Sequence, residues 1–245
     1  MALIRWTLLL TATALFPALA AAADDTMGLY PMKSTYGAEL ERGITISGEA
    51  TRSLSPTDDG SWVYRFDVDS FIADIRESSR LRFQDGKVIS ERYRYSLEGF
   101  FLSNRYKKLD FNWDEEVIVD RENDRRFDIS EHPGVQDQLG AQLQLWLDLR
   151  AGKETMEYVI PDEGDFKDYQ FEVLRKETLD TREFGNVETV VVERIREEDS
   201  PRTTLMWFAP EWDHLLVRLE QTNEDGEDFE IYLKSATLDS ERIQP

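Results

Sequence analysis

Hydrophobic and polar residues alternate with a period of two along most of the chain. The clearest run has Trp62, Tyr64, Phe66 and Val68 on one face and Arg65, Asp67 and Asp69 on the other. Three further runs share the pattern: Ile89, Tyr93 and Tyr95 against Ser90, Arg92 and Arg94; Tyr169, Phe171 and Val173; and Phe229, Ile231 and Leu233 against Glu230 and Lys234. Successive side chains of a strand point to opposite faces, so this pattern predicts half-buried antiparallel strands.

Turn residues separate these runs. Asp-Gly pairs occur at 59–60, 85–86 and 225–226. They favour tight hairpins because both residues tolerate a positive φ. Looser turns are expected at 163–165 and 185–186. The spacing of runs and turns predicts roughly ten to twelve strands.

One segment, Gly134 to Arg150, departs from the alternation. Its apolar residues recur at steps of four and are flanked by others that widen the same face: Val135, Leu139, Leu143 and Leu147, with Leu145, Trp146 and Leu149. This spacing predicts an amphipathic helix. Asp128 or Ser130 is expected to cap its start, Pro133 suits a first turn, and Gly152 lies where the helix would end.

These elements predict a mainly β fold. A lone amphipathic helix among many strands buries its apolar face best against the sheet. We therefore expect one large, curved antiparallel sheet, an open half-barrel, with the helix on its concave side. A β-sandwich is the alternative, because the sequence does not set sheet curvature. No repeat or Pro/Gly/Ser-rich linker divides residues 24–245, so we expect one domain there.

The first 23 residues have the pattern of a secretory signal peptide. Arg5 provides the positive charge, an apolar run from Trp6 to Phe16 follows, and Pro17 precedes an alanine-rich cleavage region. We expect cleavage after Ala23. The alternative, an uncleaved membrane anchor, is disfavoured because the apolar run is shorter than the ~20 residues that span a bilayer.

Composition narrows the function classes. The chain has 50 acidic and 29 basic side chains, a formal net charge of −21, which argues against nucleic acid and anionic membranes as partners. It has no cysteine, which excludes disulfides and the acylated cysteine of a lipoprotein. With only two histidines, a multi-histidine metal centre is impossible. We therefore expect no cofactor and no structural metal.

No motif indicates catalysis. His132 and His214 are expected to be turn residues bonded to nearby backbone, and no G-x-S-x-G elbow, Walker loop or G-x-G-x-x-G is present beyond residue 23. The acidic clusters lack the spacing of a calcium loop and are expected on a solvated face, which leaves weak calcium binding open. A carboxylate-dependent hydrolase is the least favoured function, and we predict no catalytic residue.

The large apolar side chains remain. They either fill the core or line an apolar groove between the helix and the sheet. On the second interpretation the groove would accept a lipid chain or an apolar segment of a partner. Its predicted binding residues are Leu139, Leu143, Trp146 and Leu147 of the helix with Trp62, Trp113 and Trp207 of the strands.

Several strings occur in a familiar order: GEATRSL at 48–54, DGSW at 59–62, ESS at 77–79, DFNW at 110–113, the helix beginning DQL at 137–139, WFAPEWD at 207–213 and LLVRL at 215–219. Together with the leader, they resemble the Domain of Unknown Function 3108 (DUF3108) family of Gram-negative cell envelopes. Many members have a proline where this chain has Ile89 to Arg92, and another where it has Leu216. Both positions are expected at strand entrances.

The resemblance implies a periplasmic protein with no established activity, cofactor or catalytic residue. It also implies a likeness to the open half-barrels of periplasmic lipoprotein carriers, which concerns architecture alone. The favoured function is a non-catalytic binding or carrier module for a lipid, a lipidated protein or another apolar partner. The alternative is an envelope interaction or scaffold protein with a filled core. No nucleic acid and no integral membrane segment are expected in either case.

Overall fold

The computed structural model describes residues 28–41, 45–100, 103–162, 164–196, 200, 202–223 and 227–244. The predicted signal peptide and the Asp225-Gly226 turn lie outside these residues. Within them, the secondary structure consists of strands β1 (Met32–Glu41), β2 (Thr45–Pro56), β3 (Trp62–Ser70), β4 (Ala73–Gln84), β5 (Lys87–Gly99), β6 (Arg105–Asn112), β7 (Val117–Asp120), β8 (Arg125–Asp128), β9 (Thr155–Asp162), β10 (Asp165–Thr181), β11 (Gly185–Ile195), β12 (Thr203–Ala209), β13 (Leu215–Thr222), β14 (Asp228–Leu238) and β15 (Glu241–Arg242), the helix α1 (Gln138–Arg150) and the short 3₁₀ helix η1 (Pro210–Trp212).

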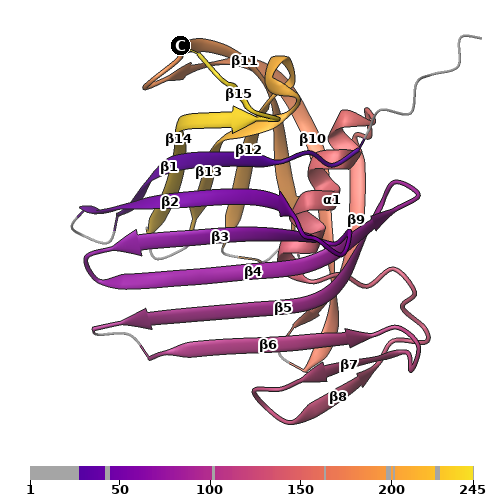
Figure 1. Cartoon of the computed structure of the whole chain (residues 1–245). Helices are drawn as coiled ribbons and strands as arrows, with labels where there is room; N and C mark the ends of the chain where they lie inside the picture. Colours follow the sequence, from indigo (N-terminus) through magenta and orange to yellow (C-terminus); the bar gives the residue numbers. More distant parts are fainter. Residues whose placement is uncertain are drawn as a thin grey trace, which may run out of the picture.

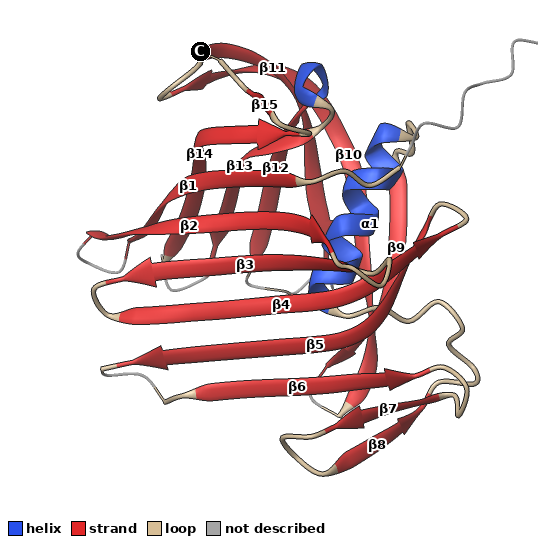
Figure 2. Cartoon of the chain, viewed as in Figure 1, coloured by secondary structure: helices blue, strands red, loops and turns tan. Residues whose placement is uncertain are grey.

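All described strands belong to one antiparallel sheet. Its order is β8-β7-β6-β5-β4-β3-β2-β1-β14-β13-β12-β11-β10-β9, with β15 added beside β14. The sheet thus consists of two meanders joined where β1 pairs with β14, and α1 lies in the connection between the two edge strands, β8 and β9. The sheet curves around the helix (Figures 1 and 2). The predicted fold class is confirmed, including the single long helix of the described chain.

The two sheet edges do not pair with each other, so the sheet is not closed into a barrel. Side chains bridge the gap instead. Lys107 Nζ of β6 donates to the Pro161 carbonyl of β9 at 2.6 Å, and the rings of Phe127 and Phe166 meet edge to face with centroids 6.1 Å apart. These contacts cover part of the open edges, which would otherwise be free to pair with another chain.

The hairpin turns follow the predicted residues. Asp85 and Gly86, which join β4 to β5, both have positive φ (52° and 75°), as a tight two-residue turn needs. Gly60 and Gly185 also have positive φ in the predicted turns. The strand count was too low, because β7 and β8 have only four residues each and β15 has two. Runs this short show little alternation.

A β-bulge in β5 corrects one predicted face. Arg80 pairs with Arg92 and Leu81 with Ser90, so Glu91 is an extra residue in the ladder. An extra residue reverses the phase of the alternation. Ser90 therefore points into the core, fully buried, while Ile89 is half-buried on the other side. The prediction that Ile89 shares a face with Tyr93 was wrong.

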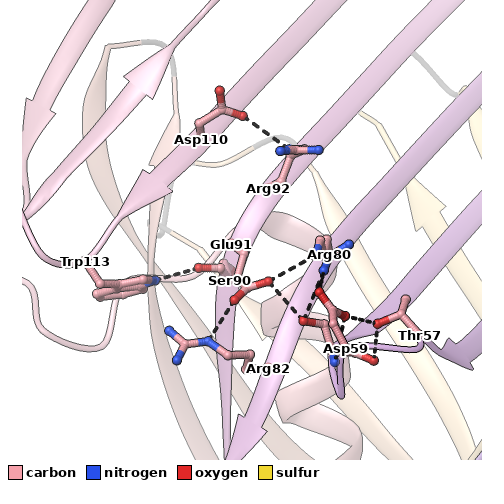
Figure 3. A network of polar contacts seen from close by, with 10 residues as sticks. Thr57, Asp59, Arg80, Arg82, Ser90, Glu91, Arg92, Asp110 and Trp113 are labelled. Carbon is pink, nitrogen blue, oxygen red and sulfur yellow. Dashed lines mark hydrogen bonds and ion pairs between the residues drawn. The ribbon is translucent and has the colours of Figure 1, made fainter.

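The bulge also affects the side chains on the outer face of the sheet. It places the Glu91 carboxylate between Arg82 Nε at 2.8 Å and Arg80 Nε at 3.2 Å, in the polar network of Figure 3. The Ser90 carbonyl accepts a bond of 2.7 Å from Trp113 Nε1 in the same network.

Val217 is a second bulged residue, because Trp207 pairs with Arg218 and Phe208 with Leu216. The two positions where many members of the resembled family have proline, 89–92 and 216, therefore lie at or beside bulges, where sheets tolerate proline.

The helix starts later than predicted. Its N-cap is Asp137, whose side chain accepts from Gly140 N at 2.8 Å, and neither Asp128 nor Ser130 caps it. Asp128 instead accepts from Ser130 N within a local turn. The preceding residues are held outside the helix, because Gln136 N donates to the Val159 carbonyl of β9 at 3.0 Å.

The helix is buried almost all round rather than along one stripe. Only Gln138, Gln142 and Arg150 are half-buried, and its other ten residues are buried. One side packs into a cluster of core residues with β3 to β7, through Leu139, Leu143 and Leu147. The opposite side packs into a second cluster with β9 to β14, through Ala141, Leu145 and Leu149. The helix therefore lies inside the curved sheet and divides its core into two parts.

Candidate functional site

A cavity of about 270 Å³ lies between α1 and the concave face of the sheet. Strands from both meanders line it, as do helix residues 138, 141, 142, 145 and 146. Small-molecule sites in proteins usually measure about 300–1,000 Å³, so this volume suits a slim ligand. The core between the helix and this part of the sheet is thus not completely filled.

Much of the cavity wall is apolar and aromatic. Tyr36, Leu145, Phe171, Met206, Phe208 and Leu216 contribute to it, and each of them is buried. Tyr36 also ties the two meanders together, because its hydroxyl donates to the Leu216 carbonyl at 3.0 Å. A wall of this kind favours a hydrocarbon group over a polar one.

A basic side chain lies in this apolar wall beside the helix. Arg52 of β2 donates from Nη2 to Gln142 Oε1 at 3.0 Å, and its guanidinium lies over the rings of Tyr64 (5.7 Å) and Phe66 (5.1 Å). Its Nε is buried without a hydrogen-bond partner. Among the described residues, no carboxylate is within ion-pair distance of Arg52. A half-buried guanidinium in an apolar wall is costly without a counter-ion, so this arrangement is ready for an anion.

The nearest acid in the cavity is Glu77 of β4. It is 8% exposed, and burial raises its pKa to about 7, against the opposing effects of a bond from Tyr93 and the charge of Arg52. The Tyr93 hydroxyl lies 2.5 Å from Glu77 Oε1 and 2.9 Å from Gln138 Oε1. A hydroxyl has one proton, so both contacts are satisfied when a protonated Glu77 donates to Tyr93. Glu77 is therefore an incomplete counter-charge for Arg52 at neutral pH.

Two more arginines stand at another part of the cavity, on and just after β11. The Arg194 guanidinium stacks on the Tyr169 ring at 3.4 Å, and Arg196 Nη1 donates to Thr204 Oγ1 at 3.1 Å. Burial, with the positive charges of Arg194 and Arg202, lowers the pKa of Arg196 to about 10. Positive charge is therefore concentrated at this position as well.

The sheet register shows that these two basic positions are far apart. Arg52 pairs with Ser34 near the start of β1, whereas Thr204 belongs to a row that runs through Gln221 and Phe229 to Leu40 near the end of β1. About 20 Å of extended strand separates Ser34 from Leu40. The helix occupies the Ser34 end of the sheet (Figure 1), so Arg52 is at the helix-covered end and Arg194 and Arg196 are near the open end.

The structure distributes the predicted binding residues among three places. Trp146 lines the cavity. Leu139, Leu143 and Leu147 are buried in the core on the other side of the helix, and Trp62 and Trp113 pack against that same core. Trp207 is on the opposite face of the sheet, where its Nε1 donates to Glu177 Oε1 at 2.6 Å and Arg218 lies over its ring. Six of the seven residues therefore do not line the cavity.

The sequence interpretation missed the polar residues of the cavity. Arg52 lies between Ala50 and Leu54 on the buried face of β2, and Arg194 follows Val190 and Val192 on the buried face of β11. A charged residue at an inward position of an alternating strand was the available signal. The large aromatic residues form the stronger pattern in this sequence, and they do not mark these positions.

The two histidines lie outside the cavity. The His132 ring packs against Phe166 with centroids 4.3 Å apart. His214 follows Asp213, both with left-handed backbone, and burial lowers its pKa. No group of three or more His, Cys, Asp or Glu residues suited to a metal ion occurs in the described ranges. Within those ranges, no helix is long and apolar enough to cross a membrane.

Comparisons with known proteins agree with this fold. A model of a family described as "Protein of unknown function (DUF3108)" matches residues 34–234. No curated protein matches. A β-barrel-like DUF1849 protein from Brucella abortus has a TM-score of 0.56 and 12% identity, over 86% of this chain and 98% of that one.

Two further solved structures match over similar lengths. A DUF1329 protein from Desulfovibrio piger has a TM-score of 0.27 and 10% identity, over 88% of each chain. An outer membrane lipoprotein-sorting protein domain from Vibrio parahaemolyticus, itself described as putative, has a TM-score of 0.24 and 10% identity, over 88% of this chain and 87% of that one. Of these three, the Brucella protein has a TM-score high enough to indicate a shared fold.

Proposed function

The chain belongs to the DUF3108 family, a family of unknown function, and we propose that it is a periplasmic binding or carrier module that holds one acyl chain in the cavity beside α1. The observation that carries the proposal is the cavity itself, an apolar space of about 270 Å³ enclosed by the helix and both meanders. The leader at residues 1–23 supports export to the periplasm.

The shape of the lining supports a chain-like ligand. Residues from β1 to β4 form one wall, residues from β10 to β13 form the other, and Leu145 and Trp146 of α1 stand between them. A narrow space between two walls gives an acyl chain contact on all sides, which is where apolar burial contributes most. Larger lipids would have to leave part of themselves outside.

Native mass spectrometry of the protein purified gently from cell envelopes provides the first test. We expect a bound species of lipid mass, which organic extraction removes. A second measurement uses N-phenyl-1-naphthylamine, an uncharged probe whose fluorescence rises in apolar sites. The proposal fails if the extracted protein neither carries lipid nor takes up the probe.

A pair of matched variants locates the probe. Leu219 lines the cavity from β13, so Leu219→Trp should fill it and reduce probe binding at least tenfold. Leu205 of β12 does not line the cavity, and it pairs with Glu193 and Glu220. Leu205→Trp makes the same change away from the cavity and should bind the probe normally. Equal loss in both variants would place the probe elsewhere.

A second candidate, an envelope interaction protein, is favoured by one observation. Phe71, between β3 and β4, is 93% exposed, and Phe100, after β5, is 89% exposed. The two connections are neighbours, because Phe100 N donates to the Ile72 carbonyl at 3.2 Å. Large exposed aromatic side chains often mark a partner surface. Photo-crosslinking from position 71 in intact cells would identify one protein partner if this candidate is right, and a spread of products if it is wrong.

A further inference from the structure

The polar chemistry at the helix-covered end of the cavity goes beyond the binding of an acyl chain. We propose that the ligand carries an acidic group, a carboxylate or a phosphate monoester, and that Arg52 binds this group at the end of the cavity beside α1. This inference rests on the proposed function, because it assigns the head group of the same ligand.

The position of Arg52 in the sheet provides the first argument. Its strand neighbours on the same face are Ala50 and Leu54, both fully buried, and its cross-strand partners are Ser34 and Phe66. Arg52 is therefore a charged side chain at an inward position of an otherwise apolar patch. Placing a guanidinium there is unfavourable unless it gains a charged partner.

The hydrogen bonds of Arg52 provide the second argument. A guanidinium has five N–H donors, and the structure gives this one two side-chain acceptors, Gln142 Oε1 and the Tyr64 hydroxyl. Nε is buried without a partner. The guanidinium also lies over the rings of Tyr64 and Phe66, which restrict its orientation. Unused donors on a fixed guanidinium match the two oxygens of a carboxylate or phosphate group.

The charges around Arg52 provide the third argument. The titratable groups that influence it are Tyr36 of β1, Tyr64 of β3 and Glu77 of β4, and α1 contributes the neutral Gln142. The tyrosines are neutral at pH 7. Glu77 is partly protonated and is engaged with Tyr93. The cavity therefore has a net positive charge at this end, although the whole chain carries −21.

The other basic position provides a competing location for the head group. Arg194 also has a buried Nε without a partner. Its side chain is half-buried, as that of Arg52 is, and its guanidinium stacks on the Tyr169 ring at 3.4 Å. Arg52 differs in its place, because it contacts α1 through Gln142 at the helix-covered end of the sheet. The test therefore compares both positions.

The experiment measures displacement of N-phenyl-1-naphthylamine from the full chain by three competitors of equal chain length. Hexadecanoate carries a carboxylate, 1-palmitoyl lysophosphatidic acid carries a phosphate, and hexadecan-1-ol carries no charge. For the native protein, we expect at least one acid to displace the probe at a concentration at least tenfold lower than the alcohol. Which acid is more effective identifies the source of the acidic group.

Four variants then locate the head group. Arg52→Met should lose at least tenfold in affinity for the preferred acid and keep its affinity for the alcohol and the probe within twofold. Arg52→Lys should show an intermediate loss, because lysine keeps the charge but lacks the planar guanidinium that donates two parallel hydrogen bonds to an acid. Arg65→Met, the same change at an exposed position of β3, should behave as the native protein. Arg194→Met tests the competing position, and loss of the preference for the acid in this variant alone would assign the head group to Arg194.

The outcomes separate this inference from the proposed function. If no competitor displaces the probe and no lipid is bound, the proposed function fails. If alcohol and acids compete equally, or if Arg194→Met rather than Arg52→Met removes the preference, binding stands and the Arg52 assignment is overturned. Normal probe binding by Arg52→Met shows that the variant is folded, and urea unfolding provides an independent check.

Discussion

Asp137 and Ser79 join the start of α1 to the middle of the sheet. The Ser79 hydroxyl donates to Asp137 Oδ2 at 2.6 Å, and the same carboxylate caps the helix through Gly140 N at 2.8 Å. Asp137 N in turn donates to Ser90 Oγ of β5 at 2.9 Å. Asp137 and Ser79 are both fully buried. One side chain therefore fixes both where the helix begins and which strands it starts against.

Replacing Asp137 should detach this end of the helix. Asp137→Ala removes a cap and leaves the Gly140 N–H and the Ser79 hydroxyl buried without partners. We expect the free energy of unfolding to fall by roughly 2–4 kcal/mol. Asp128→Ala, at the residue that the sequence pattern had favoured as a cap, should cost under about 1 kcal/mol, because Asp128 is exposed. Urea unfolding measures both, and similar losses would contradict the assignment of the cap.

Glu77 should make stability depend on pH. Its pKa is raised from 4.5 to about 7 because it is buried. Between these values the unfolded chain has lost the proton and the folded chain keeps it, so stability is highest below about pH 4.5 and falls as pH rises through 7. Glu77→Gln removes this group.

The comparison with Glu77→Gln isolates that contribution from other titrating groups. Relative to the native protein, the variant should gain up to about 3 kcal/mol between pH 5 and pH 8. Urea unfolding at a series of pH values provides the measurement. Parallel curves for the two proteins would show that the Glu77 carboxyl does not titrate in this range.

Gly37 of β1 leaves room for the ring of Tyr232 on β14. A Cβ on Gly37 would lie 2.2 Å from Tyr232 Cζ, and the Arg182 guanidinium covers the same ring at 3.8 Å. Gly37→Ala should therefore displace both side chains and destabilise the protein by about 1–3 kcal/mol. The double variant Gly37→Ala with Tyr232→Ala should recover part of the loss caused by Gly37→Ala. A purely additive double variant would exclude this contact as the cause.

Trp146 joins the cavity to the far end of α1. Its Nε1 donates to the Asp213 carbonyl at 2.7 Å, and the Arg150 guanidinium lies 4.5 Å from its ring. Trp146→Phe keeps most of the ring and loses the bond, so we expect a loss of about 1 kcal/mol. Trp146→Ala should cost about 3–5 kcal/mol. Urea unfolding tests both values, and a loss below about 1 kcal/mol for Trp146→Ala would show that the ring contributes little to packing.

The structure also shows why the sequence pattern failed where it did. Alternation identifies which face of a strand is buried only while the ladder has no extra residue. Glu91 in β5 and Val217 in β13 each shift the phase by one. The shift at Glu91 is the reason that Ser90, and not Ile89, lies on the buried face of β5. The helix can approach the inward Ser90 because residue 140 is glycine, since a Cβ there would lie 2.7 Å from Ser90 Oγ.

The candidate site was less predictable than the fold. Trp146 was expected in a groove and does line the cavity, but Leu139, Leu143 and Leu147 point to the other side of the helix. A helix surrounded by sheet has two apolar sides, and periodicity alone does not show which side is left incompletely packed. Arg52 and Glu77 were not expected, because a charge at one inward position carries little weight against a dominant pattern.

The sequence alone determined the antiparallel strands, their hairpins at Asp59-Gly60 and Asp85-Gly86 and the single helix, because these depend on local periodicity and on residues that tolerate positive φ. Only the tertiary structure decided that β1 pairs with β14, that the helix is buried on both sides, and that Arg52, Glu77 and Gln142 line one cavity. Those relationships join residues far apart in the chain. They arise from the way the two meanders curve around the helix, and no local sequence pattern specifies that arrangement.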